Sequence, residues 1–259
     1  MQDSFSNFTV IMTVYNSLPF SIAARSINSC FDNVLYNPGE VIVIGDGVDK
    51  WDFSKVEINN RDKIVFKSIK KSGLAHALNI AVSIAKFNII ARMDGDDICI
   101  NSRFDKQIPY FLKGKYDLLG ANILKRDLAN KEKDKRSKMF KSEKLLRRLL
   151  WTAPFNHPTV IFKKDHFIKV GKYNHNYQRR QDLDLWYRYQ KGAKIGNMSD
   201  IVLNYSYNSL ENRTFSSVIN QIKIGSKAAF ENGFFIDVPL GFTVLLKWCF
   251  INIISIIKK

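Results

Sequence analysis

The most constraining feature of this sequence is a regular alternation of short apolar segments and helical patterns over residues 8–94. The apolar segments lie at residues 8–16, 39–49, 63–69 and 88–94, and their composition is typical of strands. The segments at residues 17–31 and 72–86 repeat their apolar side chains with helical spacing. Because strands that alternate with helices form βαβ units, the pattern predicts an α/β fold with a mostly parallel sheet flanked by helices.

The composition agrees with a globular chain and limits its chemistry. With 259 residues, of which 46% are hydrophobic, the chain is long enough to bury a substantial core. Its three cysteines are far apart in the sequence, which argues against a disulfide framework or structural zinc site and suits a reducing compartment. No secretory signal is visible at the N-terminus.

The net charge of +16 is distributed unevenly along the chain, and one stretch carries +7 of it. Residues 125–148 contain eleven Lys or Arg against four Asp or Glu, which suits a polyanion such as nucleic acid, an anionic membrane leaflet or a diphosphate. A solvated loop is the alternative interpretation. We find no helix-turn-helix, zinc-finger or RNP-like pattern, so nucleic acid is not the expected partner.

Three carboxylates lie at the end of the apolar segment at residues 88–94 and directly after it. Asp94, Asp96 and Asp97 repel one another, and a cation that neutralises them would remove this cost. Hard oxygen ligands suit Mg²⁺ or Mn²⁺, and either ion can bridge a substrate diphosphate. Asp46 ends another predicted strand, and ligands of parallel sheets bind outside the carboxyl ends of the strands. The alternative is a simple turn in which Asp97 or Asn101 caps the next helix.

Six motifs in order resemble one enzyme family over residues 8–205. They are TVIMTVYN, EVIVIGDGVD, KKSGLAHALNIAV, IIARMDGDDICINSRFDKQ, HPTVIFKK and QDLDLWYRY. The chain is similar to the GT-A-fold inverting glycosyltransferases of family 2, and among them to bacterial enzymes that build O-antigen or capsule repeat units. The resemblance implies a GT-A (Rossmann-like) domain over residues 1–215. Its nucleotide-sugar half would span about 1–102 and its acceptor half about 103–215, followed by a helical tail at 216–259.

The resemblance also implies roles for individual residues, beginning with those for the donor. The nucleotide and its sugar would contact Thr13, Tyr15, Asn16, Asp46, Lys71, Gly73 and Asp94. Asp96 would ligate Mn²⁺ or Mg²⁺, with Asp97 supporting it, so both are assigned to the metal.

Other residues would serve the acceptor. Asp182 would be the general base. Gln181 stands where the family usually has Glu, and its amide can hydrogen-bond an acceptor hydroxyl but cannot share a proton. His157 would orient an acceptor phosphate or simply fill the core. The Arg-x-His of many relatives is absent from residues 205–215.

The function that this resemblance implies is transfer of a hexose with inversion. The donor would be a UDP-sugar, UDP-glucose or UDP-galactose. The acceptor would be an N-acetylhexosamine on an undecaprenyl-diphosphate-type lipid, with a β-1,3 linkage in O-antigen or capsule biosynthesis. Two alternatives are a nucleotidyltransferase and a non-catalytic protein that binds a membrane surface.

The most apolar segment, residues 238–259, predicts where the enzyme works. Lys247 lies in its middle, at a cost of roughly 2.5–3.5 kcal/mol for insertion across a bilayer. We therefore expect a helix that lies in the membrane interface, with a span or a core-packed helix as alternatives. Arg147 and Arg148, in the basic stretch, would meet the acceptor diphosphate at an anionic membrane surface. The expected location is peripheral, at the cytoplasmic face of the bacterial inner membrane.

Overall fold

The computed structural model describes residues 7–49, 57–127, 135–136, 153–190, 192–207 and 215–231. Its strands are β1 Phe8–Val14, β2 Glu40–Asp46, β3 Ile64–Ile69, β4 Ile89–Arg92, β5 Ile98–Cys99, β6 Leu118–Asp127, β7 Lys135–Arg136, β8 Ile161–Lys163 and β9 Ile195–Tyr207. Its α-helices are α1 Phe20–Ser29, α2 Leu74–Ile84, α3 Arg103–Lys113, α4 Lys164–Lys169, α5 Gln181–Tyr189 and α6 Phe215–Glu231.

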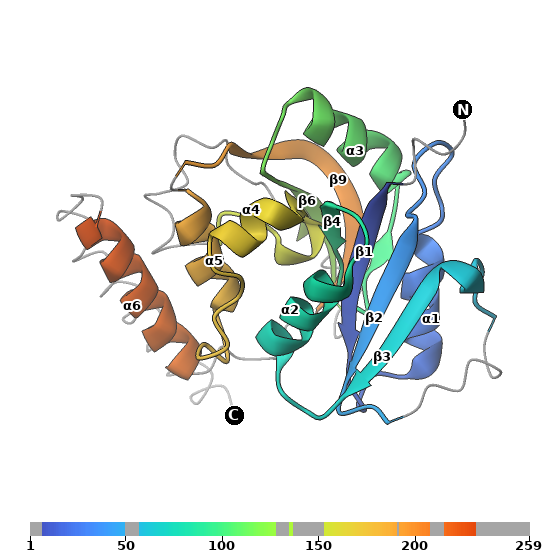
Figure 1. Cartoon of the computed structure of the whole chain (residues 1–259), viewed down its shortest axis with the longest axis horizontal. Coiled ribbons are helices and arrows are strands. Elements are labelled where there is room, and N and C mark those ends of the chain that lie inside the picture. The colour runs from blue at the N-terminus through green and yellow to red at the C-terminus, as the bar shows by residue number, and fades with distance from the viewer. Residues whose placement is uncertain are drawn as a thin grey trace.

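The first half of the sheet is the predicted βαβ structure. Strands β3, β2, β1 and β4 lie side by side in this order, and all three pairs are parallel (Figure 1). Helix α1 connects β1 to β2 and helix α2 connects β3 to β4, as crossovers between parallel strands require. Strands β1 and β2 are buried along their whole length, which explains why they read as continuous apolar runs.

The prediction of a mostly parallel sheet is wrong for the second half, because the complete sheet is mixed. Strand β8 pairs antiparallel with β4 and with β6, while β9 runs parallel to β6 and antiparallel to β5. A crossover that contains a helix makes the two strands that it joins parallel. Beyond β4 the neighbouring strands of the sheet are not successive in the chain, so this rule does not determine their direction. Apolar spacing reports which face of a strand is buried but carries no information about strand direction.

Two apolar cores lie on opposite faces of this sheet. In β1, Val10 and Met12 face the core that contains α1 and α3, whereas Ile11 between them faces the core that contains α2 and α5. Each core combines residues from both sides of position 102, so the proposed nucleotide and acceptor halves share one packed structure. The boundaries assigned to these halves stay a prediction.

Helix α6 lies at the opposite end of the molecule from β3 and packs beside α5 (Figure 1). Within the described residues, no helix is both long enough and apolar enough to cross a membrane. The apolar segment 238–259 lies outside the described residues, as do Arg147 and Arg148. The membrane-associating tail and the basic acceptor contact therefore stay predictions.

Candidate active site

The parallel register brings the predicted strand-end residues to one edge of the sheet. Val14 at the end of β1 pairs with Gly45, one residue before Asp46, and Ile11 pairs with Arg92 at the end of β4. The segments that follow β1, β2 and β4 therefore emerge side by side. This edge is where an open parallel sheet binds ligands.

Gly95 is required in the acidic loop because the end of β1 comes very close to it. A Cβ atom at this position would lie 2.9 Å from Cγ1 of Val14 and 3.0 Å from the carbonyl oxygen of Thr13. Both distances are shorter than ordinary carbon contacts. The glycine thus lets the loop lie directly against β1. Its φ angle is not positive, so the lack of a side chain, and not an unusual backbone conformation, is the reason for glycine here.

A cavity of about 720 Å³ opens at this edge and reaches across to α5. Six residues expected in the site line it: Tyr15, Asp94, Asp96, His157, Gln181 and Asp182. Other expected residues are described but are not part of this lining: Thr13, Asn16, Asp46, Lys71, Gly73 and Asp97. The cavity therefore joins the acidic loop to the start of α5, although Gln181 is 85 positions after Asp96 along the chain.

Arg92 is a cavity residue that the motif assignments missed. Its side chain is only 2% exposed, and its Nη1 donates to Oδ2 of Asp94 at 2.9 Å, with a second contact from Nη2 to Oδ1. Such a bidentate pair fixes the orientation of the Asp94 carboxylate. A basic residue in the apolar strand "NIIARMD" is the signal that could have indicated a role for it, because an unpaired charge is costly there.

Asp96 and Asp97 differ in what surrounds them. Asp96 lines the cavity, and no described basic side chain forms an ion pair with it. Burial raises the pKa of the Asp96 carboxyl, and the negative charge of Asp94 raises it further. Asp97, at the end of the same loop, is fully buried, and its Oδ1 accepts a hydrogen bond from the Ser206 backbone N–H at 3.2 Å.

These carboxylates are of the ligand type that would hold a divalent cation bound jointly with a substrate. The Oδ2 atom of Asp97 is buried without a hydrogen-bond partner among the described residues, and the pKa of Asp97 is raised well above its usual value by burial and by Asp94. No group of three Asp, Glu, His or Cys in the described residues could hold a metal alone. Mg²⁺ and Mn²⁺ commonly take one or two carboxylates together with water and phosphate oxygens, which suits this donor set.

Helix α5 presents Asp182 in its first turn. Burial raises the pKa of the Asp182 carboxyl, while the positive charge of Arg180 lowers it. Arg180 precedes the helix in a left-handed conformation (φ 68°), and its Nε donates to Oγ of Ser217 in α6 at 3.0 Å. Gln181, Asp182 and Arg180 all line the cavity. The start of α5 thus offers a carboxylate of increased basicity beside cationic and amide groups.

Asp46, Lys71 and Gly73 gather at the neighbouring strand end. Oδ1 of Asp46 accepts from the Ser72 backbone N–H at 2.6 Å, and Oδ2 accepts from the Gly73 N–H at 2.9 Å. Asp46 therefore holds the loop that leads into α2, with Gly73 at a positive φ of 92°. Lys71 in this loop is exposed. The expected contacts of these residues with a nucleotide stay predictions.

His157 lines the cavity and contacts helix α5. Its Nε2 is 2.8 Å from the hydroxyl of Tyr173, and its ring packs edge-on against Trp186 of α5. Burial and the positive charge of Arg92 lower the pKa of His157 well below its usual value. The imidazole is therefore neutral at physiological pH.

The cavity is also lined by residues that the sequence patterns did not assign to the site. They include Lys125, Arg179, Arg180, Tyr205, Ser206 and Ser217. Lys125 and Tyr205 pair with each other in the β6–β9 ladder, which no local pattern predicts. With Arg92, the cavity is thus lined by four basic side chains, Arg92, Lys125, Arg179 and Arg180, as well as by its acids.

The fold and the cavity define an α/β transferase of the GT-A-like type, with a curled mixed sheet and its polar site at the strand ends. A model of the family described as "Glycosyl transferase family 2" matches residues 9–171, which is more than half of the chain. The chain belongs to glycosyl transferase family 2. This membership supports a glycosyltransferase over the nucleotidyltransferase and the non-catalytic binding protein.

Three curated relatives are similar over most of their length. The amylovoran biosynthesis glycosyltransferase AmsE of Erwinia amylovora is 30% identical over 76% of this chain and 74% of its own. The O-antigen biosynthesis glycosyltransferase WbnJ of Escherichia coli is 34% identical over 67% and 70%. The UDP-Gal:alpha-D-GlcNAc-diphosphoundecaprenol beta-1,3-galactosyltransferase of Escherichia coli is 26% identical over 80% and 76%.

The solved structures that resemble this chain include TarS of S. aureus. TarS superposes with a TM-score of 0.64 at 18% identity, over 87% of this chain and 39% of that one. The complex of TarS 1–349 with UDP-GlcNAc gives a TM-score of 0.61 at 18% identity, over 87% and 66%. The chain thus spans less than two thirds of either TarS structure. At this level of identity the likeness shows the fold.

Proposed function

We propose that this glycosyltransferase moves a hexose from a UDP-sugar to an N-acetylhexosamine on a lipid diphosphate, with inversion at the anomeric carbon. The observation that carries the proposal is the cavity in which Asp96, after β4, and Asp182, at the start of α5, face a common space. O-antigen or capsule biosynthesis is the expected context, since WbnJ is described as an O-antigen biosynthesis glycosyltransferase and AmsE as an amylovoran biosynthesis glycosyltransferase.

In the proposed reaction the acceptor hydroxyl attacks the anomeric carbon of the donor in a single displacement. Asp182 accepts the proton of this hydroxyl as the new C–O bond forms. The bond between the anomeric carbon and the diphosphate oxygen breaks, and the nucleoside diphosphate takes the electron pair. The raised pKa of the Asp182 carboxyl, caused by burial, makes it a stronger base than an exposed aspartate.

The donor is assigned to the edge formed by β1, β2 and β4. TarS in complex with UDP-GlcNAc, and a relative described as using UDP-Gal, support a UDP-sugar. Asp96, assisted by Asp97, would hold Mn²⁺ or Mg²⁺, which would offset the negative charge of the leaving diphosphate. Arg92 keeps Asp94 oriented toward the cavity, where its carboxylate is available to a sugar or ribose hydroxyl.

The acceptor is assigned to the side of the cavity formed by α5 and residues 153–158. The 26% identical galactosyltransferase, whose description includes a diphosphoundecaprenol acceptor, supports a lipid diphosphate and a β-1,3 linkage. Such an acceptor resides in a membrane, so we place the enzyme peripherally at the cytoplasmic face of the bacterial inner membrane. The tail at 238–259 would hold it there, and Arg147 and Arg148 would contact the acceptor diphosphate.

A donor and acceptor screen tests this function. Purified full-length protein with Mn²⁺ is incubated with UDP-glucose, UDP-galactose and their N-acetyl forms, using a synthetic lipid-diphosphate N-acetylhexosamine as acceptor. We expect one UDP-hexose to be consumed with formation of a β-1,3-linked disaccharide, identified by mass spectrometry and NMR. Transfer from another nucleotide class, or hydrolysis alone, would contradict the proposal.

A further inference from the structure

Tyr173 is a buried tyrosine outside the cavity that contacts a residue of the cavity. Its side chain is 2% exposed, and its hydroxyl lies 2.8 Å from Nε2 of His157. His157 lines the cavity together with Asp182, whereas Tyr173 does not. An effect of the Tyr173 hydroxyl on the site therefore passes through His157.

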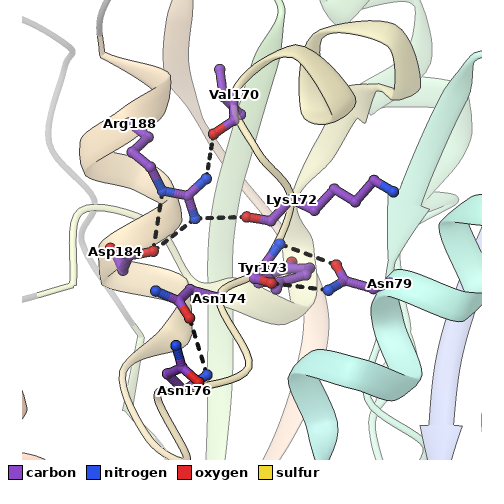
Figure 2. A network of polar contacts seen from close by, with 8 residues as sticks. All are labelled: Asn79, Val170, Lys172, Tyr173, Asn174, Asn176, Asp184 and Arg188. Carbon is purple, nitrogen blue, oxygen red and sulfur yellow. Dashed lines mark hydrogen bonds and ion pairs between the residues drawn. The ribbon is translucent and has the colours of Figure 1, made fainter.

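The backbone of Tyr173 is held by helix α2. The Tyr173 N–H donates to Oδ1 of Asn79 at 3.0 Å, and Nδ2 of Asn79 donates back to the Tyr173 carbonyl at 2.9 Å (Figure 2). This pair of hydrogen bonds satisfies both polar groups of the Tyr173 backbone. Helix α2 follows Gly73, so the tyrosine backbone is anchored to a helix that begins beside a residue expected to contact the nucleotide.

Helix α5 holds the same loop from the other side. Arg188 donates to the carbonyl oxygens of Val170 and Lys172, the latter at 2.6 Å, and its guanidinium pairs with Asp184 at 2.7 Å (Figure 2). Asp184 and Arg188 lie one turn apart on the helix that begins with Gln181 and Asp182. The loop that carries Tyr173 is thus tied to the helix of the proposed base.

The position of the shared proton follows from the partners available. Tyr173 has no other hydrogen-bond acceptor for its hydroxyl among the described residues, and burial raises its pKa, so it keeps its proton. The hydroxyl therefore donates to Nε2 of His157. Because burial and Arg92 lower the pKa of His157, its ring is neutral and carries its hydrogen on Nδ1.

We infer that Tyr173 is a positioning residue that holds the imidazole of His157 so that its Nδ1–H donates to a neutral oxygen of the acceptor sugar. This inference rests on the proposed function. A neutral donor suits a hydroxyl or an amide carbonyl better than a phosphate, because it offers one hydrogen bond and no charge. His157 would then hold the sugar whose hydroxyl faces Asp182, in place of the acceptor phosphate expected from the sequence.

The first test removes the hydroxyl alone. Tyr173→Phe should raise the KM for the synthetic lipid-diphosphate acceptor by about fivefold to tenfold, because one oriented hydrogen bond is lost, and leave the KM for the UDP-sugar unchanged. Tyr189→Phe is the matched control. Tyr189 lies in the same apolar core, and its buried hydroxyl has no partner among the described residues, so neither KM should change.

The second test replaces the donor atom. At position 157, the side-chain amide nitrogen of asparagine would lie near the position of histidine Nδ1, and that of glutamine near the position of histidine Nε2. His157→Asn should therefore raise the acceptor KM by no more than Tyr173→Phe does and should make Tyr173→Phe neutral in the double variant, whereas His157→Gln should raise the acceptor KM further. An unchanged acceptor KM in Tyr173→Phe, equal rises of both KM values, or a full Tyr173→Phe effect beside His157→Asn would overturn the inference.

The third test reads the tautomer without substrate. The chain has four histidines, so ¹⁵N-labelled protein gives few ring signals, and those of His157 are identified by their loss in His157→Asn. We expect the Nδ1–H tautomer between about pH 6 and 8, and a shift toward Nε2–H in Tyr173→Phe. Transfer activity combined with an Nε2–H or charged His157 would overturn the inference alone. Absence of sugar transfer with every UDP-sugar would instead overturn the proposed function, and with it the acceptor role of His157.

Discussion

At the scale of single residues, the environment of Asp182 determines how the activity should depend on pH. A general base accepts a proton only in its deprotonated form, so the rate falls as the pH drops through its pKa. Because burial raises the pKa of Asp182, this acid limb should lie above the range of an exposed aspartate. The positive charge of Arg180 lowers the pKa of Asp182, so a change of this charge should shift the acid limb.

We predict that Arg180→Gln moves the acid limb of kcat/KM to higher pH. The substitution removes the positive charge that lowers the pKa of Asp182, so more of the carboxyl is protonated at a given pH. Ser217→Ala removes the hydrogen bond to Arg180 but keeps the charge, and its limb should stay near that of the wild type. Identical limbs in all three proteins would argue against Asp182 as the titrating base.

Asp182→Asn should lower transfer by roughly 10²–10⁴-fold, the usual contribution of a positioned base. Binding of UDP, measured by calorimetry, should persist because the amide has nearly the same shape. Full transfer by this variant would refute the assignment.

Asp96 should be necessary for the metal-dependent part of the reaction. EDTA should abolish transfer, and Mn²⁺ or Mg²⁺ should restore it in the wild type but not in Asp96→Asn, because an amide is a poorer ligand than a carboxylate. Asp200→Asn, which changes an exposed aspartate in β9, serves as the control and should respond to metal as the wild type does. Undiminished activity in EDTA would exclude the metal assignment.

At the scale of secondary-structure elements, the packing of the acidic loop on β1 sets the geometry of the site. Gly95→Ala places a methyl group within 3.0 Å of the end of this strand, so either the strand or the loop has to move. We predict a loss of about 1–3 kcal/mol in the free energy of unfolding, measured by urea denaturation, and reduced transfer. Wild-type stability and activity would mean that the close approach is not required.

At the scale of the whole molecule, the proposed acceptor requires that the cavity be held near a membrane. Deletion of residues 240–259 should move the protein from the membrane fraction to the soluble fraction while transfer to a short-chain, water-soluble acceptor persists. Retention of the truncated protein on membranes would refute the anchor.

The local patterns of the sequence were sufficient for strands β1 to β4 and the two helices between them. Residues of β1, β2 and β4 are buried, which makes them continuous apolar runs, and the helical pattern of α1 between β1 and β2 and of α2 between β3 and β4 is what predicts parallel pairing. The same patterns placed Asp46 and the acidic loop at strand ends. These features depend on neighbouring residues, and local spacing records them.

The sequence by itself determined the α/β class, the family resemblance and the carboxylates at the strand ends. Only the tertiary structure decided the directions of β8 and β5, the ion pair of Arg92 with Asp94, and the hydrogen bond between Tyr173 and His157. It also decided that Gly95 serves close packing against β1. The physical reason is distance along the chain: strand direction, packing clearance and most side-chain partners depend on segments that meet only after folding, and periodicity within a segment contains no record of them.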